Sequence, residues 1–115
     1  MKLEQIIRDD VIVFNILGRV EYEDVDEFQH AVKNLIQETP ENGSSRKVVI
    51  NLEQTEFMNS VGLGCIINLA NDIRAVGGDL KLARPNRELA RLFDVVNLVK
   101  NFEIYNSIEA AVDSF

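Results

Sequence analysis

A short polar segment followed by two glycines is the part of the sequence best suited to chemistry. Asn59 and Ser60 follow a hydrophobic stretch, and Gly62 and Gly64 come next, at the start of an apolar helical pattern. The oxygen of Asn59 or of Ser60 could cap that helix by accepting a hydrogen bond from a backbone N–H. Capping does not explain two glycines, since each is about 1 kcal/mol less favourable than alanine within a helix. We therefore expect a bare first turn that leaves the Ser60 hydroxyl and nearby amides open to another molecule.

Other residue types that perform chemistry are few and isolated. The single histidine, His30, falls in a helical pattern and is expected to face solvent, and the single cysteine, Cys65, is expected to be a small buried hydrophobe. The carboxylates of residues 9–10 and 21–24 fit a turn and a helix start. No nucleophile–base pair, metal-ligand cluster or phosphate-binding glycine–lysine motif can be read from the spacing. We therefore expect no enzymatic activity, no metal and no cofactor.

The elements that must position Ser60 follow from hydrophobic periodicity. Strands are predicted over residues 3–8, 11–17, 47–52, 79–83 and 101–105, and helices over 21–39, 60–76, 86–96 and 107–115. We expect a hairpin turn at Asp9–Asp10, the end of the second strand at Gly18, and a loop over 40–45. This alternation predicts a single α/β domain, residues 1–115, with a mixed, mostly parallel sheet of four to five strands and helices packed on it.

The same patterns predict the core and the helix starts. Residues at the strand and helix periods that should be buried are Ile50, Leu63, Ile66, Leu69 and Ile73, and the first helix carries an apolar stripe at Val25, Phe28, Val32 and Leu35. Side chains expected to cap helices are Asp24 with Glu27 for the first helix, Asn86 for the third and Ser107 for the last.

Composition narrows the class of partner. The 115 residues carry a formal net charge of −7, which argues against a nucleic-acid or anionic membrane surface as the main partner. No signal peptide and no apolar run long enough to span a bilayer is visible. One cysteine allows no internal disulfide, which fits a reducing cytoplasm. We expect a cytoplasmic protein that binds another protein.

The segment VVINLEQTEFMNSVGLG, residues 48–64, resembles the signature of STAS domains, the anti-sigma-factor antagonist family of bacteria. The family's usual form is an apolar strand, a short loop and then D-S-S-G-L-G. The likeness continues in GRVE at 18–21, in AVGGDLKLARPNRELARLFDVVNL at 75–98 and in IYNSIEAAV at 104–112. It covers nearly the whole chain in order, with no inserted domain.

This resemblance implies a function as well as a STAS-like fold. Members bind an anti-sigma factor that is also a serine kinase, and binding frees the sigma factor. The kinase phosphorylates the first serine of the motif, which ends the interaction, and a serine phosphatase reverses it. That serine falls on Ser60. The implied partner-binding surface comprises the loop 54–60, the start of the following helix and the turn from Arg19 to Asp24, with Glu21, Asn59, Ser60, Val61, Gly62 and Gly64 as its named residues.

Two positions depart from the family motif. Asn59 stands where the family has an aspartate, so the capping oxygen is kept and the charge is lost, and Val61 stands where the family has a second serine. These departures support an alternative, an unphosphorylated STAS scaffold or a subunit of a larger transporter-associated or stress-complex assembly. A second alternative, an enzyme or small-ligand binder with an α/β fold, has no usable histidine, metal cluster or phosphate loop in its favour.

Overall fold

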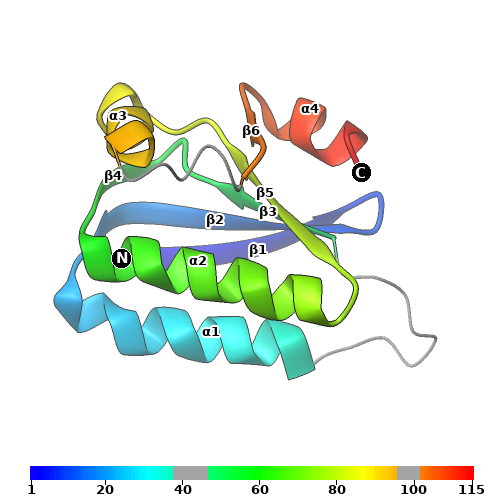
Figure 1. Ribbon diagram of the computed structural model, residues 1–115, viewed down its shortest axis with the longest axis horizontal. Coiled ribbons are helices and arrows are strands. Elements are labelled where there is room, and N and C mark those ends of the chain that lie inside the picture. The colour runs from blue at the N-terminus through cyan, green and yellow to red at the C-terminus, as the bar shows by residue number, and fades with distance from the viewer. Residues whose placement is uncertain (38–46, 96–101) are drawn as a thin grey trace.

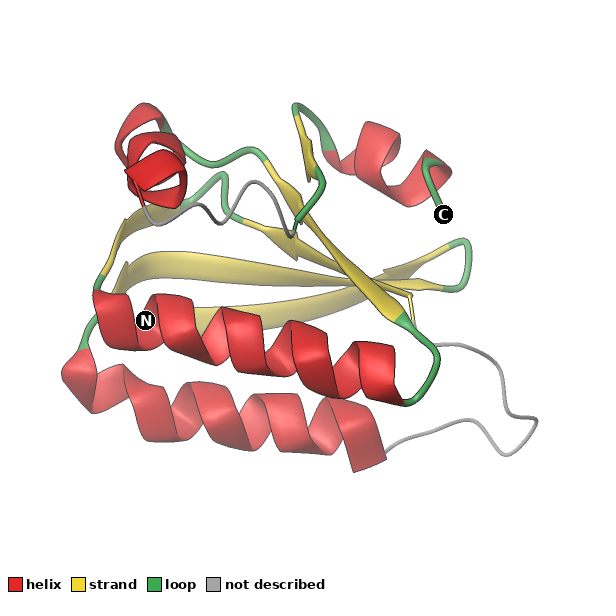
Figure 2. Ribbon diagram, in the orientation of Figure 1, coloured by secondary structure: helices red, strands yellow, loops and turns green. Residues whose placement is uncertain are grey.

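The strands form one mixed sheet, with two long helices packed side by side along it in the computed structural model (Figure 1). The structure describes residues 1–37, 47–95 and 102–115. In chain order the elements are β1 Lys2–Arg8, β2 Val11–Val20, the short 3-10 helix η1 Tyr22–Asp24, α1 Val25–Gln37, β3 Lys47–Asn51, β4 Thr55–Met58, α2 Ser60–Ala75, β5 Asp79–Ala83, α3 Arg87–Val95, β6 Ile104–Tyr105 and α4 Ile108–Asp113. Helices and strands alternate through most of the chain, as Figure 2 shows.

The sheet is parallel except at its first hairpin. The order of the strands is β1-β2-β3-β5-β6, and β4 pairs separately with β2. The β1–β2 pair is antiparallel, and every other pair among the described residues is parallel. The mostly parallel α/β fold is thus confirmed, with six strands rather than four to five. The additional strand is β4, which follows β3 after a short turn.

A two-residue turn joins β1 to β2. Arg8 pairs with Val11, so only Asp9 and Asp10 lie outside the ladder. Both aspartates have positive φ, 49° and 70°. A two-residue hairpin loop needs left-handed conformations of this kind to match the twist of its strands, and aspartate tolerates them better than most residues. The predicted hairpin is confirmed.

The structure corrects two predictions near Gly18. The second strand does not end at Gly18 but continues to Val20, because glycine adopts a φ of 87° there and the ladder shifts register between Gly18 and Arg19. The expected loop over 54–60 contains the strand β4, whose Phe57 pairs with Arg19 and whose Met58 pairs with Val20. Both errors have one cause, since β4 finds a partner only if β2 passes through the glycine.

Apolar side chains cover the two faces of the sheet unequally. The larger cluster lies between the sheet and the helices α1, α2 and α3. It contains all five residues predicted to be buried, Ile50, Leu63, Ile66, Leu69 and Ile73, none of them more than 4% exposed. The smaller cluster lies under α4 on the other face and consists of Val11, Val13, Val49, Ala83, Ala111 and Val112.

The helix starts agree with the sequence in most cases. Asn86 and Ser107 accept hydrogen bonds from the backbone N–H groups of Leu89 and Ala110, as expected of caps. The first helix differs, because its chain enters through η1, where the Glu21 N–H donates to Asp24 Oδ2. The predicted pairing of Asp24 with Glu27 as a capping box is therefore wrong.

Some predictions concern residues outside the described ranges. The loop over 40–45, the last residues of the first helix and residue 101 of the last strand lie there, as do the side chains of Val32 and Leu35. Phe28 of the same apolar stripe is buried and Val25 is half-buried. Among the described residues, no helix combines the length and apolar character that crossing a membrane requires.

Candidate functional site

The strand β4 carries the chain to the start of α2 and is fixed at several points. The Thr55 hydroxyl, which is buried, donates to the carbonyl of Ile16 at 2.7 Å. The Asn86 side chain, at the start of α3, donates to the carbonyl of Thr55 at 3.0 Å. The Asn59 N–H donates to the carbonyl of Val20 at 3.1 Å. The position of the following residue, Ser60, is therefore set by β2, β4 and α3 together.

Asn59 caps the helix and Ser60 does not. The Asn59 side-chain oxygen accepts a hydrogen bond from the N–H of Gly62 at 2.8 Å, and Asn59 has the extended backbone of an N-cap residue. Ser60 is the first residue of α2 and is exposed. Within the described ranges, its hydroxyl has no hydrogen-bond partner. The open choice between Asn59 and Ser60 is thereby decided, and the serine oxygen remains available to another molecule.

The two glycines of the motif have different surroundings. A Cβ on Gly62 would lie 2.7 Å from Cγ1 of Val20 and 3.0 Å from Cγ of Met58, which is closer than packed atoms approach. Gly62 is buried, so the expectation that it leaves an open surface is wrong: the helix packs against β2 and β4 there. A Cβ on Gly64 would meet nothing within 4 Å. Only Gly64 fits the expectation of open space.

Apolar side chains are exposed around Ser60. Val61 and Phe57 are both 39% exposed, and Tyr22 of η1 is 77% exposed. The Arg19 guanidinium lies 4.6 Å from the centre of the Phe57 ring and pairs with Glu21 at 3.0 Å. These residues come from β2, η1, β4 and α2, and each of these segments contacts one of the others. We call Tyr22, Phe57 and Val61, together with the ion pair of Arg19 and Glu21, the rim of Ser60.

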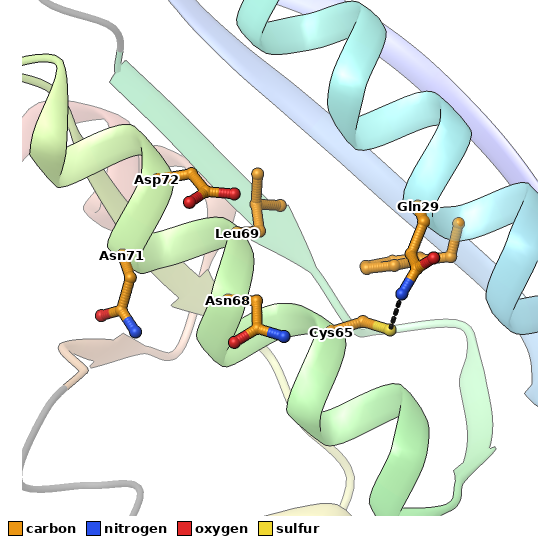
Figure 3. A pocket seen from close by; sticks show the side chains of 7 residues that line it. Gln29, Cys65, Asn68, Leu69, Asn71 and Asp72 are labelled. Carbon is orange, nitrogen blue, oxygen red and sulfur yellow. Dashed lines mark hydrogen bonds between the residues drawn. The ribbon is translucent and has the colours of Figure 1, made fainter.

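A groove of about 450 Å³ lies beside α1 and α2 (Figure 3). It is lined by Phe28, Gln29, Cys65, Asn68, Leu69, Asn71 and Asp72. The Gln29 amide points toward Cys65 and donates weakly to its Sγ at 3.9 Å. Burial raises the pKa of the Cys65 thiol, so little reactive thiolate forms at neutral pH. Cys65 thus behaves as the predicted buried hydrophobe, and His30 is exposed as predicted.

The described part of the chain shows no group of three or more histidine, cysteine, aspartate or glutamate side chains that could hold a metal ion. The groove offers amides, one carboxylate and the thiol of Cys65, and the side chain that contacts this thiol is the Gln29 amide, which is not a base.

The sequence indicates the residues of this candidate site but not the contacts that hold them in place. Gly62 packs against Val20, and Asn86 donates to the carbonyl of Thr55, and each of these contacts joins positions more than 30 residues apart. No spacing pattern in the sequence signals contacts over such a distance. Arg19 and Phe57 lie within the predicted surface, but no pattern in the sequence predicts their contact with each other.

Comparisons with known proteins agree on the family. The sequence model of the STAS domain matches residues 2–111. A protein of Thermotoga maritima, provisionally named an anti-sigma factor antagonist, is 27% identical over 107 residues, which cover 93% of this chain and 91% of that protein. A protein of Thermotoga neapolitana, provisionally named as a homolog of that kind, is 31% identical over 72 residues. That match covers 63% of this chain and 64% of the relative, which is less than two thirds of the relative's length.

Solved structures show the same fold. A crystal structure from Thermotoga maritima, described as that of a provisionally assigned anti-sigma factor antagonist, has a TM-score of 0.85 and 25% identity, covering 97% of this chain and 92% of that one. The phosphorylated form of the Bacillus cell fate determinant SpoIIAA has a TM-score of 0.74 and 19% identity, covering 98% of each chain. The latter likeness concerns the fold alone.

Proposed function

The chain belongs to the STAS domain family, and we propose on this basis that it is an anti-sigma factor antagonist that phosphorylation of Ser60 switches off. Its partner in this proposal is an anti-sigma factor that is also a serine kinase, and a serine phosphatase restores binding. Relatives over most of the chain are named as anti-sigma factor antagonists, which supports the class of partner. The observation that supports a phosphorylation switch is the exposed Ser60 hydroxyl. It is free for modification because Asn59, and not Ser60, caps the helix.

The start of α2 can accept a phosphate without losing its structure. A phosphoserine carries about −1.5 to −2 charges at pH 7, and a helix N-terminus favours negative charge. Gly62 and Leu63 already donate their N–H groups to Asn59. The N–H groups of Ser60 and Val61 have no partner in the part of the chain that the structure describes, and they could donate to the phosphate. The fold should therefore survive modification.

The rim of Ser60 supports a protein, rather than a small ligand, as the binding partner at this site. Exposed aromatic and aliphatic side chains next to an arginine are typical of the centre of a protein interface. Asn59, Val61, Gly64 and Glu21 belong to the proposed surface, whereas Gly62 supports it from below. A phosphate on Ser60 would lie next to the exposed Val61, within the proposed surface. A bound partner would then have to desolvate a dianion or pair it, which weakens binding without a change in this domain's fold.

The test uses an anti-sigma factor kinase from the same organism as the candidate partner. Incubation with that kinase and ATP should add one phosphate, and mass spectrometry should find it on Ser60. In titration calorimetry, Ser60→Ala should bind the kinase like wild type and stay unmodified, while Ser60→Asp should bind more weakly. Ser107→Asp is the matched control, because it places the same charge at the start of α4 and should leave binding unchanged.

Two results would contradict this proposal. One is a phosphate on Thr55 or another residue, and the other is a Ser60→Asp variant that binds as tightly as wild type. Binding without any modification would favour the second candidate, a scaffold or subunit that is not phosphorylated. Asn59 is the observation that favours this candidate, because the family motif has an aspartate there. Asn59→Asp keeps a capping oxygen and restores the charge, so recovery of phosphorylation in this variant would attribute the loss to Asn59.

A further inference from the structure

The outer edge of β1 is long, exposed and unpaired. β1 has seven residues and lies at the end of the strand order, and no described strand pairs with its outer side. All of its residues except Leu3 are exposed, and Ile6 and Ile7 are 42% and 71% exposed. An exposed edge of this length, with two isoleucines, is a template for pairing with another strand.

The hairpin determines which backbone groups face outward. In a two-residue hairpin the closing pair, here Arg8 and Val11, exchanges both of its backbone hydrogen bonds. Alternation along the strand then directs the N–H and C=O groups of Leu3, Gln5 and Ile7 away from β2. Two antiparallel β1 strands can pair only if outward-facing residues oppose outward-facing residues. This condition restricts the two-fold axis between two copies to a residue position on β1.

Overlap and charge together select the axis, because an axis at Leu3 or at Ile7 would pair only three residues of each strand. With the axis at Gln5, Lys2 would oppose Arg8 of the other copy, and with the axis at Glu4, two glutamates would meet. Like charges directly opposite each other destabilise a strand pair. With the axis at Ile6, Glu4 opposes Arg8 and the two isoleucines meet at the centre. The pair of Glu4 with Arg8 occurs twice, because a two-fold interface repeats every contact.

We propose that two copies of this chain associate through their β1 edges, as antiparallel strands related by a two-fold axis at Ile6. The association extends each sheet into the other and pairs Glu4 with Arg8 across the interface. Arg8 already contacts Glu109 of its own chain at 2.9 Å, but both groups are exposed and the guanidinium has five donors. This inference does not rest on the proposed function, since the start of α2 takes no part in it.

A disulfide test reports the position of the axis directly. Paired residues at the axis that do not share hydrogen bonds have Cα atoms about 4.5 Å apart, within the range of about 4.4–6.8 Å that a disulfide spans. Under mild oxidation, Ile6→Cys should convert to a covalent dimer, while Gln5→Cys and wild type should stay unlinked. The native Cys65 is 7% exposed and provides the background in all three proteins.

Reduced proteins should show the same association without a covalent bond. In sedimentation velocity over a concentration series, wild type should shift from monomer to dimer. Ile6→Lys should lose the dimer, because two positive charges would then meet on the axis. Ile7→Lys is the control, since Ile7 is even more exposed and lies off the axis. Glu4→Arg and Arg8→Glu should each weaken the dimer, and the double variant should restore it. Thermal melts verify that each variant is folded.

The proposal has clear contrary outcomes. A wild type that stays monomeric over the whole series overturns it. So does a dimer that Ile6→Lys leaves intact, or one that Gln5→Cys links and Ile6→Cys does not. Failure of the charge swap to restore association would overturn the assigned register.

Discussion

Helices α2 and α4 begin with the same kind of hydrogen bond, yet they leave their serines in different states. At α4, the Ser107 hydroxyl accepts from the N–H of Ala110 at 3.0 Å. At α2, Asn59 accepts the equivalent bond, and the exposed Ser60 follows it. A group added to Ser107 would remove a cap, whereas a group added to Ser60 would not. The comparison teaches that a serine becomes available for modification when its neighbour caps the helix.

The two helices also cover different cores. α2 buries seven residues against the sheet, including Ile66 at 0% exposure. α4 has six residues and covers the smaller cluster, where Lys81 is 6% exposed. The Lys81 ammonium donates to the Ser114 carbonyl and hydroxyl at 3.0 and 2.7 Å. Apolar packing therefore dominates under α2, and polar contacts contribute a larger share under α4.

The largest expected effect concerns packing under α2. Ile66→Ala should lower the free energy of unfolding by roughly 2–5 kcal/mol, because it leaves a cavity in the larger cluster. Val112→Ala, at 7% exposure under α4, should lower it less, since fewer atoms are lost from a smaller cluster. Denaturant titration measures both. Equal losses would mean that the two faces contribute alike and that the contrast between the helices is wrong.

The next effect separates the two glycines. Gly62→Ala should lower the free energy of unfolding by roughly 1–3 kcal/mol, because its methyl group would overlap Val20 and Met58. Gly64→Ala should raise it by up to about 1 kcal/mol, since alanine is a better helix former and the space is open. The same denaturant titration applies. A stabilising Gly62→Ala would show that the helix moves away from β2 at no cost.

Removing the caps tests the comparison itself. Asn59→Ala and Ser107→Ala should each lower the free energy of unfolding by about 1 kcal/mol. Ser60→Ala should change it by no more than about 0.5 kcal/mol, because the exposed hydroxyl makes no bond in the described structure. Thermal and denaturant unfolding of the three variants provide the measurement. A Ser60→Ala loss as large as that of Asn59→Ala would show that Ser60 shares the cap.

The smallest effect depends on pH and belongs to the α4 side. Hydrogen bonds from Tyr105 and then from Lys81 lower the pKa of the exposed Glu103 below its ordinary value of 4.5. The unfolded chain therefore binds a proton at Glu103 first as the pH falls. The stabilisation is complete above the ordinary value and disappears as the pH falls through the lowered pKa. Melting temperatures of wild type and Glu103→Gln should differ slightly near neutral pH and converge in acid. A gap that widens in acid would contradict this assignment.

The sequence predicts the repeating parts of this fold well and its long-range contacts poorly. The core positions from Ile50 to Ile73 and the caps Asn86 and Ser107 follow from local periodicity and side-chain chemistry, and the structure confirms them. The strand β4 could not be predicted, because four residues give too short a pattern and their partner lies beyond Gly18.

The candidate site divides in the same way. A serine at the start of a helix is readable from the sequence, and the structure supplies the choice of Asn59 as the cap. The motif's two glycines look alike in the sequence, and only the neighbours of Gly62 in space distinguish it from Gly64. Val20 and Met58 cannot be assigned to that role without the pairing of β2 and β4.

The burial of Cys65 provides a way to measure how often α1 and α2 separate in the folded protein. It is the single cysteine of the sequence, it is 7% exposed, and Gln29 of α1 lies against its sulfur. Because so little of its side chain is exposed in the groove, a thiol reagent should react with it mainly during transient local openings of the folded protein. The modification rate, compared with that of the unfolded chain, therefore yields the fraction of time that the two helices are apart. Because a phosphate on Ser60 is expected to leave the packing intact, that fraction should be the same before and after phosphorylation.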